Sequence, residues 1–209
     1  LVRRVTGQPI EERVEKRVFE PLGMDHTSIG VGDGDPEAVA TLSGFDVFDR
    51  CRDAGEGLGI PASDSAATFN RADVRRAVIP AATGIGTARD MARFYACMAN
   101  GGELDGTRLL DADTVENATR THAETDDDGT LSRPARYGLG FWTGGFANDM
   151  FGTFAPERTF GHAGLGSVFC WGDPEANLGF AYVTNGIREE SWEHAARVNA
   201  LANAVRLLV

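Results

Sequence analysis

The stretch that decides the fold is Phe160-Gly-His-Ala-Gly-Leu-Gly-Ser167, because two apolar segments follow it closely. The first, Ser167-Val-Phe-Cys-Trp171, is rich in the branched and aromatic residues that favour strands. In the second, residues 178–183, large and small residues alternate, and the Gly, Asp, Pro and Asn residues of 172–177 are typical of a turn. The pattern predicts an antiparallel hairpin. Tyr137-Gly-Leu-Gly-Phe-Trp142 predicts a further strand.

Helical periodicity appears before and after these strands. A short amphipathic helix is predicted from Pro9, with apolar residues every four positions and a stop at Pro21-Leu-Gly23. Thr87-Ala-Arg-Asp90 resembles a capping box and opens a helix whose Met and aromatic stripe we assign to the core. A second short helix is expected from a cap at Asp111 towards residue 118. A long C-terminal helix from about residue 189 is expected to pack on the sheet.

Between Gly30 and Ala82 the chain is rich in Gly, Asp and Pro and has little periodicity. We therefore expect an irregular region with short elements.

Length and composition are those of one globular domain or a large part of one: 209 residues, 42% of them hydrophobic. The 20 basic and 31 acidic side chains give a net charge of -11. Such a chain repels phosphate backbones and anionic headgroups, so neither nucleic acid nor a membrane surface is an expected partner. No run approaches the roughly eighteen apolar residues of a membrane span.

The basic residues are almost all arginine, since Lys16 is the only lysine. This bias fits a GC-rich genome. Together with the acidic surface, it also fits a halophilic protein. The sequence is therefore compatible with either a GC-rich mesophile or a halophile as its source.

Metal and cofactor chemistry has no support in the sequence. The histidines stand far apart and the cysteines form no CxxC pair, so we predict neither a metal site nor a cofactor, and we read each cysteine as a small buried hydrophobe. These residues are His26, His122, His162, His194, Cys51, Cys97 and Cys170.

Four segments in the right order resemble the serine β-lactamase and penicillin-binding-protein superfamily, in particular its class C-like branch with esterases and D-aminopeptidases. Residues 18–27 are similar to the segment in which a helix ends at Pro-Leu-Gly-Met. Residues 81–94 look like its glycine turn and following helix. Gly101-Gly102 with Leu109-Leu-Asp111 continues the match. His162-Ala163-Gly164 occupies the place of the Lys-Thr-Gly motif, which esterase-like members write as His-x-Gly.

The resemblance implies an α+β fold, a β-lactamase/transpeptidase-like antiparallel sheet flanked by helices. It also implies a serine hydrolase that forms an acyl-enzyme. By position, the backbone N–H of Leu165 would supply one oxyanion donor, and His162 would orient the substrate or tune the base. Ala163, Gly164 and Gly166 would line the substrate-binding strand edge.

Two motifs of the family are missing. The residue three before Lys16 is Arg13, so no Ser-x-x-Lys nucleophile motif exists, and none of the tyrosines starts a Tyr-x-Asn or Tyr-x-Ser motif. In the family both motifs precede the Pro-Leu-Gly-Met segment. We therefore expect residues 1–209 to be the C-terminal portion of a single β-lactamase-related domain, incomplete at the N-terminus and inactive alone.

Three hypotheses about the function of the chain are open. The chain is part of a serine hydrolase, or a non-catalytic derivative that binds ligands, or a subunit that completes an active site with another chain. The expected partners are a small ester, a β-lactam or a D-amino-acid peptide, together with the missing N-terminal part. The His-x-Gly form of the motif favours esters over the other two substrate classes. The compartment is undetermined, with the cytoplasm slightly favoured.

Overall fold

The computed structural model describes residues 1–46, 61–129, 133–146, 149–188 and 191–209. These residues form two compact units. The sheet unit comprises Ala92–Gly164, Val168–Tyr182 and Trp192–Val209, and the N-terminal unit comprises Leu1–Met91, Leu165–Ser167 and Val183–Ser191. Each unit is described by itself.

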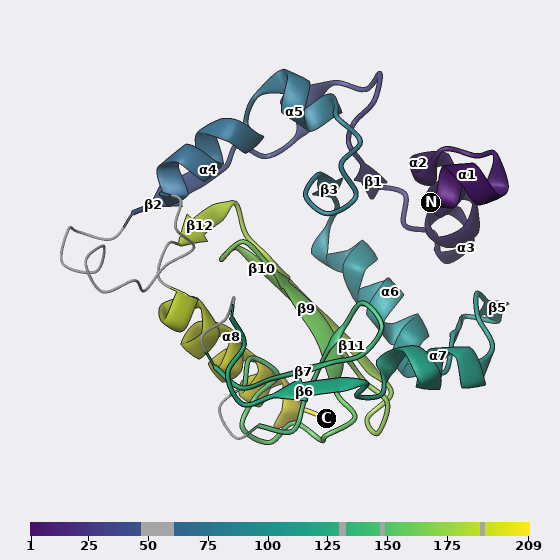
Figure 1. The fold of residues 1–209 in the computed structure, drawn as a ribbon, viewed down its shortest axis with the longest axis vertical. Helices are drawn as coiled ribbons and strands as arrows, with labels where there is room; N and C mark the ends of the chain where they lie inside the picture. Colours follow the sequence, from purple (N-terminus) through teal and green to yellow (C-terminus); the bar gives the residue numbers. More distant parts are fainter. Residues whose placement is uncertain (47–60, 130–132, 147–148, 189–190) are drawn as a thin grey trace. The chain divides into compact units, whose positions relative to one another are not determined.

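A six-stranded sheet organises the sheet unit, with the order β11-β10-β9-β8-β7-β6 (Figure 1). Neighbouring strands from β6 to β10 pair antiparallel. The turn of 174–177 between β10 and β11 is too short for any but an antiparallel connection, so the predicted hairpin is confirmed. The strands are β6 (Ala123–Thr125), β7 (Ala135–Tyr137), β8 (Trp142–Thr143), β9 (Phe160–Gly164), β10 (Val168–Asp173) and β11 (Leu178–Val183).

Helix α8 (Ser191–Arg206) lies along one face of this sheet, as the sequence predicted (Figure 1). Val198 and Ala202 on the helix form a buried core with Phe169 and Trp171 of β10. Burying aromatic and aliphatic surface of this kind stabilises the fold by about 1.5–3 kcal/mol for each large side chain.

Helix α6 (Ala88–Ala99) packs on the opposite face through its residues from Ala92 onward. A Cβ on Gly179 of β11 would lie 2.2 Å from the backbone nitrogen of Ala96, so only glycine allows this close approach. Tyr95, in the predicted Met and aromatic stripe, is buried and its ring contacts Phe141 and Phe160. The expectation of an antiparallel sheet flanked by helices is therefore confirmed.

The remaining elements of the sheet unit are short. The hairpin of β4 (Glu103–Leu104) and β5 (Thr107–Arg108) follows α6, and α7 (Ala112–Thr119) comes next. Helix α7 begins where predicted, but the Asp111 side chain makes no capping hydrogen bond.

The N-terminal unit contains the predicted first helix. It is continuous from Ile10 to Leu22, with a π-helical turn, η1 (Glu15–Phe19), between α2 (Ile10–Val14) and α3 (Glu20–Leu22). Gly23 ends it with a φ of 61°, a left-handed cap that glycine adopts without strain. Helix α1 (Val2–Thr6) precedes it.

The region expected to be irregular holds two helices, α4 (Ala62–Phe69) and α5 (Ala72–Arg76), and a 3-10 turn, η2 (Pro36–Ala38). Hydrophobic periodicity does not predict helix α4, because its core-facing residues are the small Ala62 and Ala66. These two residues pack on Ile187. The unit also has two small sheets, an antiparallel pair of β1 (Ser28–Ile29) and β3 (Gly84–Ile85), and a parallel pair of β2 (Ser43–Phe45) and β12 (Gly186–Arg188).

Two local predictions need correction. Residues 137–142 are not one strand: Tyr137 ends β7, Trp142 begins β8, and residues 138–141 form the turn between them, in which the Gly138 N–H donates to the Phe141 carbonyl and Gly140 has a φ of 87°. In the capping box, the Asp90 N–H does donate to Thr87 Oγ1, at 3.2 Å. The Asp90 carboxylate, however, accepts from the Thr27 hydroxyl and the His26 N–H, so it joins α6 to the segment after α3.

Cys97 and Cys170 are buried, as predicted, and both are free thiols; Cys51 lies outside the described residues.

Candidate active site

Strand β9 carries the predicted motif, His162-Ala163-Gly164, at its C-terminal end. Along one edge it pairs with β10, from Phe160 opposite Gly172 to Gly164 opposite Val168. Along the other edge the register with β8 pairs Phe160 with Thr143 and Gly161 with Trp142, and stops there. In the described part of the chain, β8 therefore does not extend alongside His162 and Ala163. Within the described ranges, no strand pairs with His162 and Ala163 along that edge of β9.

Leu165 follows directly in the turn from β9 to β10. It lies beyond the last ladder pair of these strands, so the β9–β10 ladder does not take up its N–H. Its φ of 38° lies in the left-handed region, which costs a branched residue about 1–2 kcal/mol, and its side chain is 40% exposed. Strained backbone of this kind is common at functional sites.

Gly166 continues the turn with a φ of 68°. A Cβ at this position would lie 2.5 Å from the carbonyl oxygen of Arg188 in β12. Next to it, the carbonyl of Ser167 accepts hydrogen bonds from the N–H and the hydroxyl of Thr184. The turn therefore packs against a second strand, which fixes its conformation.

The His162 side chain is exposed, and two contacts define its position. Its Nδ1 lies 2.6 Å from the carbonyl oxygen of Ala163, and its ring stacks on the indole of Trp142 with centroids 4.5 Å apart and an interplanar angle of 27°. Sequence reasoning did not single out Trp142. The pairing of Trp142 with Gly161 depends on the register of β8, which no local pattern reveals.

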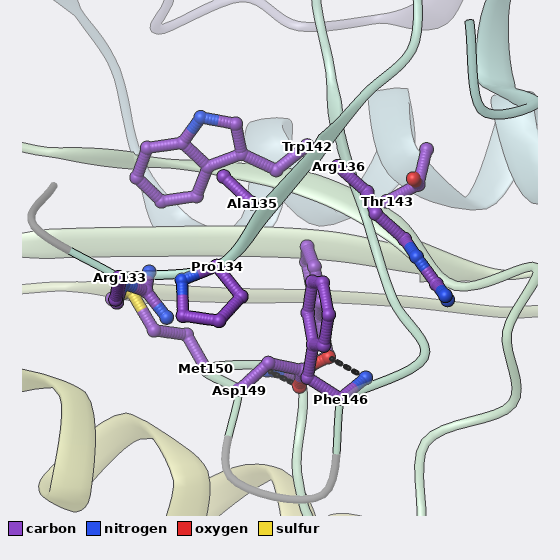
Figure 2. Close-up of a pocket in the computed structure, with 10 residues that line it drawn as sticks. Arg133, Pro134, Ala135, Arg136, Trp142, Thr143, Phe146, Asp149 and Met150 are labelled. Atoms are coloured by element: carbon purple, nitrogen blue, oxygen red, sulfur yellow. Dashed lines mark hydrogen bonds between the residues drawn. The ribbon is translucent and has the colours of Figure 1, made fainter. Parts of the chain in front are cut away.

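Trp142 also borders a small cavity of about 20 Å³, room for about one water molecule (Figure 2). Arg133 and Asp149 line the same cavity, and the Arg133 guanidinium lies 5.9 Å from the centre of the indole. Sequence reasoning missed this group too, because nothing local indicates that Asp149 is buried.

Asp149 is 5% exposed and accepts hydrogen bonds from the N–H groups of Phe151, at 2.8 Å, and Phe146, at 3.4 Å (Figure 2). Burial raises the pKa of Asp149 to about 6, although these hydrogen bonds and the charge of Arg133 oppose the shift. Within the described ranges, no three metal-binding side chains come together.

Comparison with known proteins agrees with this architecture. The model of the Beta-lactamase family matches residues 1–204. Over 200 residues, 88% of the chain, the sequence is 32% identical to the esterase/beta-lactamase LipL of Mycobacterium tuberculosis, and the match covers 45% of that protein. It is 28% identical to a putative D-alanyl-D-alanine carboxypeptidase of Escherichia coli K12, over 88% of this chain and 42% of that one.

Among solved structures, a penicillin-binding protein homologue from Caulobacter crescentus superposes with a TM-score of 0.70 at 25% identity, covering 97% of this chain and 54% of its own. The fold and these matches define a hydrolase-related class of α+β protein. The chain belongs to the Beta-lactamase family. It spans about half the length of the curated relatives it matches. Of the described helices, none has the length and apolar character needed to cross a membrane.

Proposed function

We propose that this chain contributes the substrate-binding strand and one oxyanion donor to a serine hydrolase that works through an acyl-enzyme. The observation that carries the proposal is the open edge of β9 at His162 and Ala163, followed at once by the strained turn at Leu165. An acyl substrate needs a strand edge to lie against. It also needs a backbone N–H that is not already hydrogen-bonded within the sheet and can donate to the oxyanion.

Each residue of the motif has a role in this proposal. The Leu165 N–H donates to the oxyanion, and a donor of this kind is worth about 3 kcal/mol in a catalytic step. His162 orients the substrate or assists the base, and Ala163 presents its backbone to the acyl chain. Gly164 and Gly166 are proposed to line the strand edge through their backbones, because a Cβ would lie 2.5 Å from Val168 Cγ2 at Gly164 and 2.5 Å from the Arg188 carbonyl oxygen at Gly166.

The nucleophile is proposed to come from a Ser-x-x-Lys motif outside these 209 residues, either in the same polypeptide or in a partner chain. Its hydroxyl adds to the carbonyl of the substrate, the alcohol or amine leaves with a proton, and water then hydrolyses the acyl-serine and regenerates the hydroxyl. We place a small ester first among the substrates. The motif here carries a histidine instead of the lysine that would meet a substrate carboxylate, and the relative LipL bears the name esterase.

The test is ester hydrolysis by a longer protein that includes the coding residues upstream of Leu1. His162→Ala is expected to lower kcat/KM about 10²-fold, the size of a lost acid, base or orienting group. His122→Ala is the matched control, because His122 is also exposed and bonded to a backbone carbonyl but lies on another segment. Equal activity of the His162 and His122 variants would contradict the role of β9.

A second candidate function is a non-catalytic module that binds ester-like or peptide ligands. It is favoured by the absence of Ser-x-x-Lys from the sequence. Upstream coding residues with Ser-x-x-Lys followed by a Tyr-x-Asn-like motif would exclude it. Upstream residues without these motifs, together with saturable ligand binding, would favour it.

A further inference from the structure

The contact between His162 Nδ1 and the Ala163 carbonyl determines which imidazole nitrogen carries the proton. A carbonyl oxygen only accepts hydrogen bonds, so at 2.6 Å the Nδ1 must be the donor. In the neutral ring, Nε2 is then the nitrogen with the free electron pair. The tautomer that the structure implies is therefore the one with the proton on Nδ1.

Stacking on Trp142 limits the rotation of the His162 ring. The two rings are nearly parallel at 4.5 Å, so the stack fixes the plane of the imidazole; a half-turn of the ring within that plane would keep the stack but would lose the hydrogen bond from Nδ1 to the Ala163 carbonyl. Aromatic pairs of this kind are worth about 0.5–1.5 kcal/mol beyond the area they bury.

Trp142 is itself firmly held. It pairs with Gly161 in the β8–β9 register and packs against the buried core beneath α8. The next residue, Thr143, is buried and hydrogen-bonded to the Thr121 hydroxyl at 2.7 Å. The indole is thus a fixed surface against which the exposed imidazole stacks.

We propose that Trp142 is a positioning residue: by stacking on His162 it holds the imidazole in the plane in which the Nδ1–H reaches the Ala163 carbonyl, and this leaves Nε2 as the nitrogen presented to the substrate. The importance of Nε2 rests on the proposed function, but the positioning itself does not. Trp142 touches no reacting atom in this account and acts only through His162.

Nitrogen-15 NMR of the imidazoles, at a pH where they are neutral, tests the positioning without any activity. In the wild-type protein we expect His162 to carry its proton on Nδ1 and its ring protons to resonate upfield, because the imidazole stacks on the indole. His122 is the internal control. Its Nε2 lies 2.6 Å from the carbonyl of Asn117, so it should show the opposite tautomer and no ring-current shift. A His162 with its proton on Nε2 would overturn the proposal.

Two variants of Trp142 distinguish the effect of its aromatic ring on His162 from the effect of its apolar volume. Trp142→Leu keeps apolar volume but removes the ring, and is expected to abolish the upfield shift and to mix the two tautomers of His162 while His122 is unchanged. Trp142→Phe keeps a ring and should retain most of both signals. Unchanged His162 signals in Trp142→Leu would also overturn the proposal.

The same variants in the longer, ester-hydrolysing protein give the functional readout. Trp142→Leu should lower kcat by up to about 10²-fold with a smaller change in KM, and Trp142→Phe should restore most of the rate. If the NMR signals shift as expected but His162→Ala leaves hydrolysis intact, the proposed function fails and the positioning stands. If His162→Ala impairs hydrolysis but Trp142→Leu leaves both the NMR signals and kcat unchanged, the positioning fails and the proposed function stands.

Discussion

Arg206, in the last turn of α8, forms a buried ion pair with Asp173 at the end of β10. The Asp173 side chain is 1% exposed and that of Arg206 is 10% exposed. The other Asp173 oxygen accepts from the N–H groups of Glu175 and Ala176, so the carboxylate also shapes the β10–β11 turn. Arg206 further donates to the Thr159 hydroxyl at 3.1 Å. The pair therefore joins the end of the helix to the sheet.

Arg206→Met is expected to lower the free energy of unfolding by about 3–5 kcal/mol, because it leaves a buried carboxylate without its partner. The double variant Arg206→Met/Asp173→Asn should recover part of that loss, since the unpaired charge is gone. Arg71→Met is the control. It breaks an exposed pair with Asp73 and should change little. Urea unfolding measures all three, and equal effects of the two single variants would contradict the assignment.

Gly166→Ala should destabilise the protein more than Gly140→Ala does. Both glycines have a positive φ, but a Cβ at Gly140 meets open space, whereas one at Gly166 would meet the Arg188 carbonyl at 2.5 Å. We expect a loss of about 1 kcal/mol at Gly140 from backbone strain alone, and about 1–3 kcal/mol more at Gly166 from the clash. Equal losses of unfolding free energy for the two variants, measured by thermal or urea unfolding, would show that the turn does not pack against β12.

Asp149 predicts a pH dependence of stability. Its pKa in the folded protein is about 6, above the value of about 3.9 in an unfolded chain. The folded state therefore holds this proton more tightly, and the resulting stability is full below about pH 4 and is lost as the pH rises through about 6. The loss is on the order of 3 kcal/mol. Asp149→Asn cannot titrate, so its stability relative to wild type should rise between these pH values. A constant difference would contradict the shifted pKa.

The acidic composition gives a prediction about salt. If the scarcity of lysine and the net charge of -11 reflect a halophilic origin, the melting temperature should rise between 0.1 and 3 M KCl. Over that range the screening length falls from about 10 Å to below about 3 Å, so repulsion between carboxylates is suppressed. A melting temperature that stays constant or falls would favour the GC-rich mesophile instead.

Patterns that depend on neighbouring residues were predictable from the sequence. The β10–β11 hairpin, α6, α8 and the helix stop at Gly23 all follow from periodicity and turn chemistry. The motif His162-Ala163-Gly164 was expected on a strand for a different reason, the resemblance to the family's third motif, and it lies on β9.

Features that depend on distant partners were not predictable. Residues 138–141 have the apolar and glycine composition of a strand, but the hydrogen bond from the Gly138 N–H to the Phe141 carbonyl and the positive φ of Gly140 show that they form a turn. The Asp90 carboxylate binds Thr27, 63 residues away, instead of completing the local cap. The stack of Trp142 on His162 depends on the two-residue length of β8, which is set by pairing with β9.

The central claim is that these 209 residues supply the strand and oxyanion turn but not the nucleophile. The most direct measurement treats the chain alone with a chromogenic ester and a chromogenic cephalosporin, before and after a serine-directed phosphonate, and follows adduct formation by intact mass. We predict no hydrolysis that the phosphonate abolishes and no stoichiometric adduct. A phosphonate-sensitive rate, with one adduct per chain on a serine of this sequence, would contradict the account.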